Sequence, residues 1–363
     1  MLGHLKKGMQ YKFWLVSILA GILFITGCYR SPLPKNTKES EEAFLNPSAM
    51  EQQSVESVVR LPGRYGSLSP KGDQIALYLN RRPALINQSD FNRIMSSSSL
   101  FPGDTKGLKN PRWDSTGDRV LFYGEPSNGG DPMTVVFDVQ QSRETTLTRW
   151  WDPVMSEFGE SVAGIRQSGR SLDILYFSDG STQTWSVDTL GLTEGAYLSA
   201  CDWVDEDMLL ITSHIVDSDN NISTQLFSLD ILNGKTQPLL KFSDRCVDIQ
   251  VAPNHSLAYL VFSKGVSKPI YRTEIINLKT NQHLINQNRF RALGWHPDNQ
   301  SIIGDWSNSD SNKNLVVRWW FQQKKWAQIV SPTGNPLPVT LGVSIHPEGW
   351  ILDNQILNFG KQP

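Results

Sequence analysis

The chain has 363 residues, with 34 Lys and Arg against 36 Asp and Glu, which gives a formal net charge of −2. This near-neutral balance, without a dense cluster of Lys and Arg, argues against nucleic-acid binding. Three cysteines are too few for a disulfide framework, and their spacing is not that of a metal site. The length is sufficient for one large all-β domain behind an N-terminal targeting segment.

The N-terminus has the pattern of a secretory signal. Three lysines precede an apolar run over residues 13–25 (FWLVSILAGILFI), which is too short to cross a bilayer core about 30 Å thick. The run ends in Ile25–Cys28 (ITGC), which resembles a bacterial lipobox. That resemblance implies cleavage before Cys28 and acylation of its thiol; an ordinary signal peptide, or an uncleaved anchor with a chance cysteine, is the alternative. We therefore expect a lipoprotein signal peptide over residues 1–27.

An acylated Cys28 predicts attachment to a membrane through an N-terminal lipid. Two or more acyl chains give a stable anchor, and the resemblance places the protein in a bacterial cell envelope, facing the periplasm. Tyr29 stands where an aspartate is associated with inner-membrane retention, which favours the outer membrane over the inner one. Residues 29–54 are rich in Pro, Ser, Asn, Gln and charge and lack apolar periodicity. They indicate a flexible lipidated tether over residues 28–54, with the folded domain over residues 55–363.

The folded domain is a repeat of one short pattern. Each copy has an apolar or aromatic residue, then a turn rich in Pro, Asn, Asp and Gly, then an apolar stretch, as in residues 67–78 (SLSPKGDQIALY) and 295–303 (WHPDNQSII). We call the first apolar residue of each copy its landmark. Spacings between successive landmarks run from 38 to 52 residues. The seven landmarks are Leu68, Trp113, Ile165, Trp203, Val251, Trp295 and Ile345.

The repeat predicts four short strands per copy. Each landmark ends one strand, the turn residues supply the required backbone conformations, and the apolar stretch starts the next strand. A second strand–turn–strand element follows in several copies, for example over residues 226–240 (LFSLDILNGKTQPLL). Four strands at a period of 40–50 residues are typical of β-propeller blades, whereas frequent Gly and Pro disfavour repeated helix pairs. We therefore predict an all-β fold, a β-propeller of four-stranded blades.

The landmark segments resemble the TolB-type, WD-like propeller repeat, whose core reads roughly W-S-P-D-G-x-x-I-A-F. The resemblance covers residues 60–360 or so and implies the architecture rather than an activity. TolB carries a folded N-terminal α/β domain, where we expect only the tether. TolB-like propellers have six blades, but seven landmarks favour seven blades, with six as the alternative.

Ring closure is expected to use both ends of the domain. The last copy has room for three strands, and residues 57–61 (SVVRL) supply a spare strand before the first landmark. Joining them completes a blade and removes the exposed sheet edges that would otherwise pair with other chains.

Aromatic residues provide the candidate recognition surface. Trp113, Trp203 and Trp295 occupy equivalent repeat positions, which indicates packing between blades rather than a ligand cage. Trp150, Trp151 and Phe158 fall in residues 149–159, which we expect to be a long connection between blades 2 and 3. Such a connection is either an exposed binding loop or a cap folded back onto the ring.

Cys201 and Cys246 are expected on the inner strands of adjacent blades. Their offsets from the landmarks have opposite parity, so the two thiols could meet between blades and form a disulfide. Two separate buried cysteines are the simpler alternative.

No catalytic or metal-binding motif is recognisable. The sequence lacks G-x-S-x-G, H-E-x-x-H and C-x-x-C, and residues 217–228 lack the Gly and Glu of an EF-hand loop. We therefore predict no metal, no cofactor and no enzymatic activity. The expected function is a lipid-anchored binding scaffold whose partner is another envelope protein or a cell-wall polymer. The alternative is a propeller hydrolase or lyase with polar residues lining the central channel; acids, His or Arg converging on one channel mouth would favour it.

Overall fold

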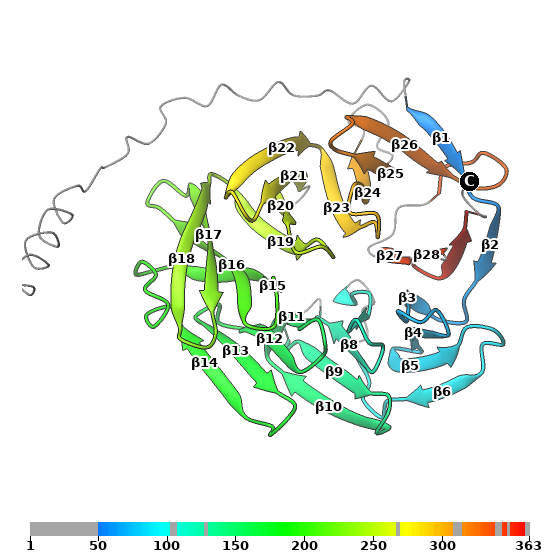
Figure 1. Ribbon diagram of the computed structural model, residues 1–363, viewed down its shortest axis with the longest axis horizontal. Coiled ribbons are helices and arrows are strands. Elements are labelled where there is room, and N and C mark those ends of the chain that lie inside the picture. Colours follow the sequence, from blue (N-terminus) through cyan, green and yellow to red (C-terminus); the bar gives the residue numbers. More distant parts are fainter. Residues whose placement is uncertain are drawn as a thin grey trace, which may run out of the picture. The chain divides into compact units, whose positions relative to one another are not determined.

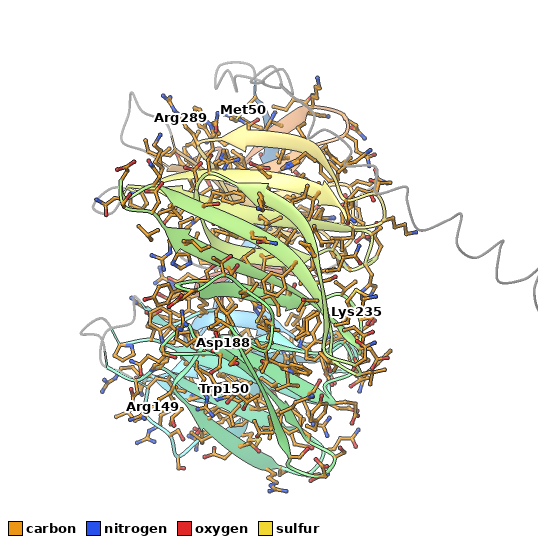
Figure 2. All side chains as sticks on the ribbon, turned by 90° about the vertical axis from the view of Figure 1, so that its left-hand side faces the viewer. Met50, Arg149, Trp150, Asp188, Lys235 and Arg289 are labelled. Carbon is orange, nitrogen blue, oxygen red and sulfur yellow. The ribbon has the colours of Figure 1, made fainter. Side chains whose placement is uncertain are left out.

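The computed structural model describes residues 50–101, 107–126, 130–265, 269–307, 314–337, 343–346 and 349–359. They form seven β-sheets arranged in a ring (Figure 1). Each sheet is a blade, and side chains fill the space between successive blades (Figure 2). Within these ranges, no helix is long and apolar enough to span a bilayer. The all-β fold and the count of seven blades are confirmed.

Blades 1 to 3 each take four consecutive strands. Blade 1 has β3 (Arg64–Leu68), β4 (Gln74–Leu79), β5 (Arg82–Asn87) and β6 (Arg93–Ser96). Blade 2 has β7 (Arg112–Trp113), β8 (Arg119–Gly124), β9 (Met133–Asp138) and β10 (Arg143–Thr148). Blade 3 has β11 (Trp150–Met155), β12 (Ser161–Arg166), β13 (Ser171–Tyr176) and β14 (Thr182–Ser186).

Blades 4 and 5 repeat this order, and blades 6 and 7 add N-terminal strands. Blade 4 has β15 (Tyr197–Trp203), β16 (Met208–Val216), β17 (Ile222–Asp230) and β18 (Lys235–Phe242). Blade 5 has β19 (Arg245–Val251), β20 (Leu257–Lys264), β21 (Ile270–Asn277) and β22 (Gln282–Asn288). Blade 6 has β23 (Phe290–Trp295), β24 (Ile302–Ser307), β25 (Asn314–Trp320), β26 (Lys325–Val330) and β1 (Glu51–Ser54). Blade 7 has β27 (Val343–His346), β28 (Gly349–Leu352), β29 (Gln355–Asn358) and β2 (Ser57–Arg60).

The ring closes as predicted, through a blade shared by both ends of the domain. Strand β2 pairs antiparallel with β29, with Ser57 opposite Asn358 and Arg60 opposite Gln355. Leu61, which follows β2, is buried between blades 7 and 1 against Ile351 and Ile75. The N-terminal strand therefore satisfies the outer edge of blade 7 and continues directly into blade 1.

Strand β1 is a fifth strand that we did not predict. Residues 51–54, which we assigned to the tether, pair in parallel with β26 at the outer edge of blade 6. Lys325 Nζ lies 2.9 Å from Glu51 Oε2, and Val55 is buried between blades 6 and 7. The side chains of residues 51–54 gave no strand signal because an edge strand is held by its backbone N–H and C=O groups. Its side chains remain in solvent and need not be apolar.

The third landmark was wrong. Met155, not Ile165, ends the inner strand of blade 3, and it lies 42 residues after Trp113 and 48 before Trp203. Ile165 belongs to β12, one strand further out. The supposed long connection over residues 149–159 is therefore β11 and the turn that follows it.

A shared hydrogen-bond pattern marks the turns after the landmarks of blades 1, 2, 3, 5 and 6. Gly72 N–H donates to Ser69 C=O at 2.9 Å, and Gly159 N–H donates to Ser156 C=O at 3.0 Å. Both glycines have positive φ, 74° and 71°. His255 takes the same position in blade 5, with φ 56°. The turn therefore accepts Gly and His at this position, and residues 155–162 (MSEFGESV) contain a copy of it with the usual glycine.

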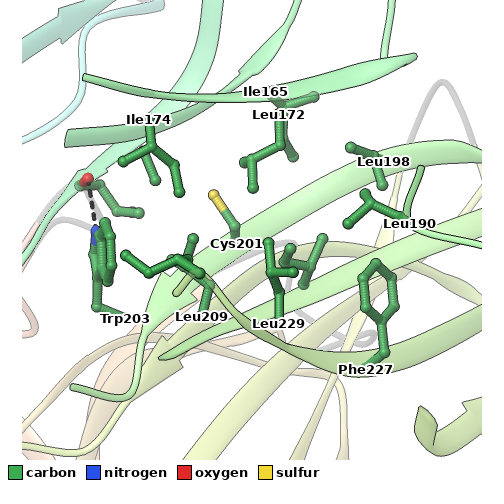
Figure 3. Packing of buried hydrophobic residues seen from close by; sticks show 14 of the residues in the cluster. Ile165, Leu172, Ile174, Leu190, Leu198, Cys201, Trp203, Leu209, Phe227 and Leu229 are labelled. Carbon is green, nitrogen blue, oxygen red and sulfur yellow. Dashed lines mark hydrogen bonds between the residues drawn. The ribbon is translucent and has the colours of Figure 1, made fainter. Parts of the chain in front are cut away.

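The three equivalent tryptophans connect neighbouring blades, as predicted. Trp113 Nε1–H donates to Ser67 C=O at 3.1 Å, so blade 2 is bonded to blade 1. Trp203 donates in the same way to Val154 in blade 3 at 3.1 Å (Figure 3), and Trp295 to Gln250 in blade 5 at 3.0 Å. Each indole thus buries its ring between blades and pairs its only donor.

The two cysteines are free and lie in different layers of the core. Cys201 packs between blades 3 and 4, beside Ile174 and Leu209 (Figure 3). Cys246 packs between blades 4 and 5. A β-bulge in β19 between Cys246 and Asp248 shifts the alternation by one residue, so both thiols point to the preceding blade. Blade 4 therefore separates them, and the proposed disulfide is not formed.

Candidate functional site in the central channel

The inner strands of the blades enclose a cavity of about 810 Å³. The first strands of successive blades, such as β11 and β15 or β15 and β19, contact each other around the centre of the ring (Figure 1). The turns that follow these strands form the rim where the cavity opens. Rim residues include Pro70, Ser115, Glu157, Asp205, Pro253 and His255.

Charged side chains from four successive blades meet in this channel. Blade 2 contributes Lys109 and Arg112, and blades 4 and 5 contribute Asp202 and Asp248. Asp152 of blade 3 lies beside them, with its Oδ1 2.6 Å from Lys109 Nζ. Asp152 sits in the β-bulge of β11 with a φ of 43°, a conformation that Asp tolerates better than most residues.

Arg112 is the centre of this cluster. Its guanidinium interacts electrostatically with Asp152, Asp202 and Asp248, without a direct ion pair to any residue that the structure describes. Burial alone would lower the pKa of Arg112, but the three aspartates outweigh it and raise the pKa further above its ordinary value. The arginine is therefore always charged, and its charge is favoured by three nearby carboxyl groups.

The three aspartates are not equivalent. Burial raises the pKa of Asp202 to about 6, although Arg112 and the Val251 N–H, which donates to Asp202 Oδ2 at 2.7 Å, both oppose the shift. Burial and the neighbouring Asp152 also raise the pKa of Asp248. For Asp152, the charges of Lys109 and Arg112 outweigh burial and lower the pKa. Asp152 is thus ionised, whereas Asp202 and Asp248 are costly to ionise. Shifted pKa values of this kind are common at functional sites.

The arrangement suits hydrogen bonding and proton exchange better than metal binding. Within the described ranges, no three His, Cys, Asp or Glu side chains come together closely enough to hold a metal ion. Asp202, with a pKa of about 6, exchanges a proton near neutral pH and accepts or donates accordingly. Acids and an arginine converging in the channel are the feature that favours the enzyme alternative.

The rim around blades 3 to 5 is acidic and carries one exposed aromatic ring. Glu157 Oε2 lies 3.3 Å from His255 Nε2, so this pair joins blade 3 to blade 5 across the short turn of blade 4. Phe158 N–H donates to Glu206 Oε1 at 2.9 Å. The Phe158 side chain is 51% exposed beside the mouth. Exposed aromatic area next to charge is typical of recognition surfaces.

The structure separates the aromatic residues that the sequence grouped. Trp150 is only 3% exposed and packs between blades 2 and 3, whereas Trp151 is 38% exposed at the opposite end of β11 from the mouth. Phe158 alone of the three lies at the channel rim, and a binding role for any of them stays a prediction. Cys28 lies outside the described residues.

Sequence reasoning missed the channel residues, although a signal was present. Arg112 and Asp202 directly precede the landmarks Trp113 and Trp203. Asp248 lies three residues before Val251, and Asp152 three before the corrected landmark Met155. Aligning the copies on the correct landmarks places charged residues at two fixed positions of the inner strand.

We expect Asp202→Asn to remove part of the pH dependence of stability. The carboxyl pKa is raised from 3.8 to about 6 on folding, so its favourable contribution is complete below pH 3.8 and lost as the pH rises through 6. Asn still accepts from Val251 N–H. The variant should therefore be more stable than the natural chain by about 1–3 kcal/mol at pH 7 and equal to it at pH 3.5. Urea unfolding midpoints measured between pH 3.5 and pH 7 test this expectation. If the midpoints of the two proteins change with pH in the same way, the raised pKa of Asp202 is contradicted.

Comparisons with known proteins bear on the fold. No family model matches the sequence, and no curated protein matches it. The β-propeller domain of Cps50 (Swd1) from Myceliophteria thermophila is 9% identical, with a TM-score of 0.56 over 83% of this chain and 98% of that one. A chain of the mitotic checkpoint complex is 13% identical, with a TM-score of 0.56 over 90% of this chain and 98% of its own. TolB from Acinetobacter baumannii is 13% identical over 72% of this chain and 62% of its own, with a TM-score of 0.44. At such identities the likeness shows the fold alone, and that fold is the β-propeller, here with seven blades.

Proposed function

We propose that this protein is a lipid-anchored β-propeller of the bacterial cell envelope that binds a protein partner at the mouth of its channel. The observation that carries the proposal is the cavity of about 810 Å³, which opens among turns from several blades. Turns of different blades form one continuous surface, and surfaces of this kind are where binding residues accumulate on rigid scaffolds.

The mouth has the chemistry of a protein-binding surface. Phe158 offers an exposed ring, and Glu157, Asp205 and Glu206 surround it with acceptors. An aromatic anchor bordered by polar groups matches the usual composition of interface centres and rims. A cell-wall polymer is the other partner class that we predicted from the sequence.

The anchoring part of the proposal rests on the N-terminal sequence. The ITGC tetrapeptide follows an apolar run and a basic flank, as a lipobox does. Acylation of Cys28 would hold the propeller at the periplasmic side of a membrane, with the outer membrane favoured.

An enzyme is the second candidate function. The paired environments of Asp152 and Asp202, one ionised and one with a pKa of about 6, suit a base and an acid in a hydrolase or lyase. Binding is favoured because the exposed aromatic ring and the acidic rim lie outside the channel, where they form a surface that suits contact with a protein partner. If the protein turns over a substrate, and Asp202→Asn abolishes that turnover while partner binding persists, the enzyme would be the correct function.

One experiment tests the anchoring and the binding surface in cells. Cys28→Ser should abolish labelling of the chain by radioactive palmitate, because only the thiol accepts the diacylglycerol. Phe158→Ser should lose most of the partner cross-linked at the envelope, since interface aromatics commonly contribute over about 2 kcal/mol. Leu232→Ser is the matched control, because Leu232 is 76% exposed in the outer hairpin between β17 and β18. Palmitate entering the Cys28→Ser chain, or equal cross-linking by both surface variants, would refute the corresponding part.

A further inference from the structure

We propose that the channel binds one basic side chain, a lysine ammonium or an arginine guanidinium, carried by a peptide segment of the partner. This inference rests on the proposed function, because it names the chemistry by which the partner enters the mouth. It is carried by the charges of the channel, the small number of acids that come together in it and the character of its walls.

Below the rim, the described residues of the channel include one carboxyl group more than their basic groups pair with. Lys109 is paired with Asp152 at 2.6 Å, and Arg291 with Asp305 at 2.8 Å. Arg112 then remains to balance both Asp202 and Asp248. One further positive charge, supplied from outside, would complete the balance in a confined, low-dielectric space where an unpaired charge is costly.

The number of acids that come together favours an organic cation over a metal ion. Asp202 and Asp248 project from neighbouring blades, and they have no third acid close enough for coordination among the described residues. An ammonium has three N–H donors and a guanidinium has five, so either group reaches carboxylates on two strands at once.

The walls suit the aliphatic stem of such a side chain. Tyr259, Tyr271 and Trp203 line the cavity together with the acids. Tyr259 donates its hydroxyl to Gln250 Oε1 at 2.7 Å and packs its ring beside Trp295, with the centroids 5.7 Å apart, so it supplies wall to the cavity rather than a polar partner. Methylene stems pack well on aromatic walls, and a cation over an aromatic face gains further attraction.

The rim would steer the same ligand inward. Asp205 lines the mouth, and Glu206 and Asp207 follow it in the blade 4 turn. A mouth lined by one sign of charge raises the local concentration of the opposite charge. An anion drawn to Arg112 is the competing occupant, but it would have to pass these acids and then face Asp202 and Asp248.

The test measures binding of three peptides to the full-length chain in detergent at low salt. The peptides are acetyl-Gly-Gly-X-Gly-Gly-amide, with X as lysine, norleucine or glutamate, titrated by calorimetry. We expect the lysine peptide to bind at least about tenfold more tightly than the other two, because norleucine has the stem without the charge. Asp248→Asn should weaken lysine binding about tenfold, and Arg112→Gln should strengthen it. Asp179→Asn, the same substitution in an exposed outer hairpin of blade 3, should change nothing.

The outcomes separate this inference from the proposed function. Tighter binding of the glutamate peptide, equal binding of lysine and norleucine, or no binding of any peptide would overturn the cation site. If Phe158→Ser still loses the partner in those cases, the binding surface stands without it. If the lysine peptide binds but Phe158→Ser keeps the partner, the cation site stands and partner docking at the mouth is refuted. Circular dichroism of each variant establishes that it is folded. If Arg112→Gln does not fold, Asp248→Asn alone decides whether the site prefers a cation or an anion.

Discussion

A chain that begins at Gly63 is expected to lose cooperative folding. This truncation removes β1 and β2, and with them the outer strands of blades 6 and 7. It also removes Val55 and Leu61, which are buried between blades 6 and 7 and between blades 7 and 1. Two bare sheet edges and two opened layers of core are left where the first and last blades of the ring meet. Thermal melting followed by circular dichroism should show a broad transition and aggregation.

Two longer chains provide the controls for this truncation. A chain starting at Met50 keeps both strands and should melt like the full-length protein. A chain starting at Val55 loses only β1, an exposed edge strand, and should lose only a few degrees. A Gly63 chain that melts within about 2 °C of the Met50 chain would contradict closure by β2.

Trp150→Ala and Trp151→Ala are expected to differ sharply in stability. Trp150 is buried among Leu121 and Val136 of blade 2 and Val162 of blade 3. Its ring lies against Gly164, where even an added Cβ would come within 2.4 Å. Removing it should lower the free energy of unfolding by about 3–5 kcal/mol, the usual cost of a buried large aromatic. Trp151→Ala should lower it by much less, since that side chain is 38% exposed.

Urea denaturation of the two single variants measures this difference. Trp320→Ala is a useful third variant because Trp320 is half-buried in blade 6, far along the chain from β11. Its loss should fall between the other two. Equal midpoints for Trp150→Ala and Trp151→Ala would contradict the assignment of β11 as an inner strand with one buried face.

Local sequence failed in blade 3 for a physical reason. Taking Ile165 as the landmark leaves residues 149–159 as a connection between blades, and Pro153 gives no contrary strand signal because proline cannot donate to a strand ladder. In the structure Pro153 lies in the bulge between Trp151 and Val154, where no ladder hydrogen bond is needed. The thiols of Cys201 and Cys246 show the same effect, since the bulge in β19 reverses the face on which Cys246 lies. Alternation therefore predicts side-chain direction only up to the next bulge.

The sequence by itself determined the blade, its turn and the way the ring closes. These features depend on neighbours along the chain: a landmark residue, a turn with one positive φ, and a spare strand at residues 57–61. Only the tertiary structure decided the channel. Arg112, Asp152, Asp202 and Asp248 stand about 40–50 residues apart, and each reads as an ordinary polar residue of a short strand. These four residues shift one another's pKa values because ring closure brings the inner strands of four blades around one cavity. There, burial and the neighbouring charges both act on each group.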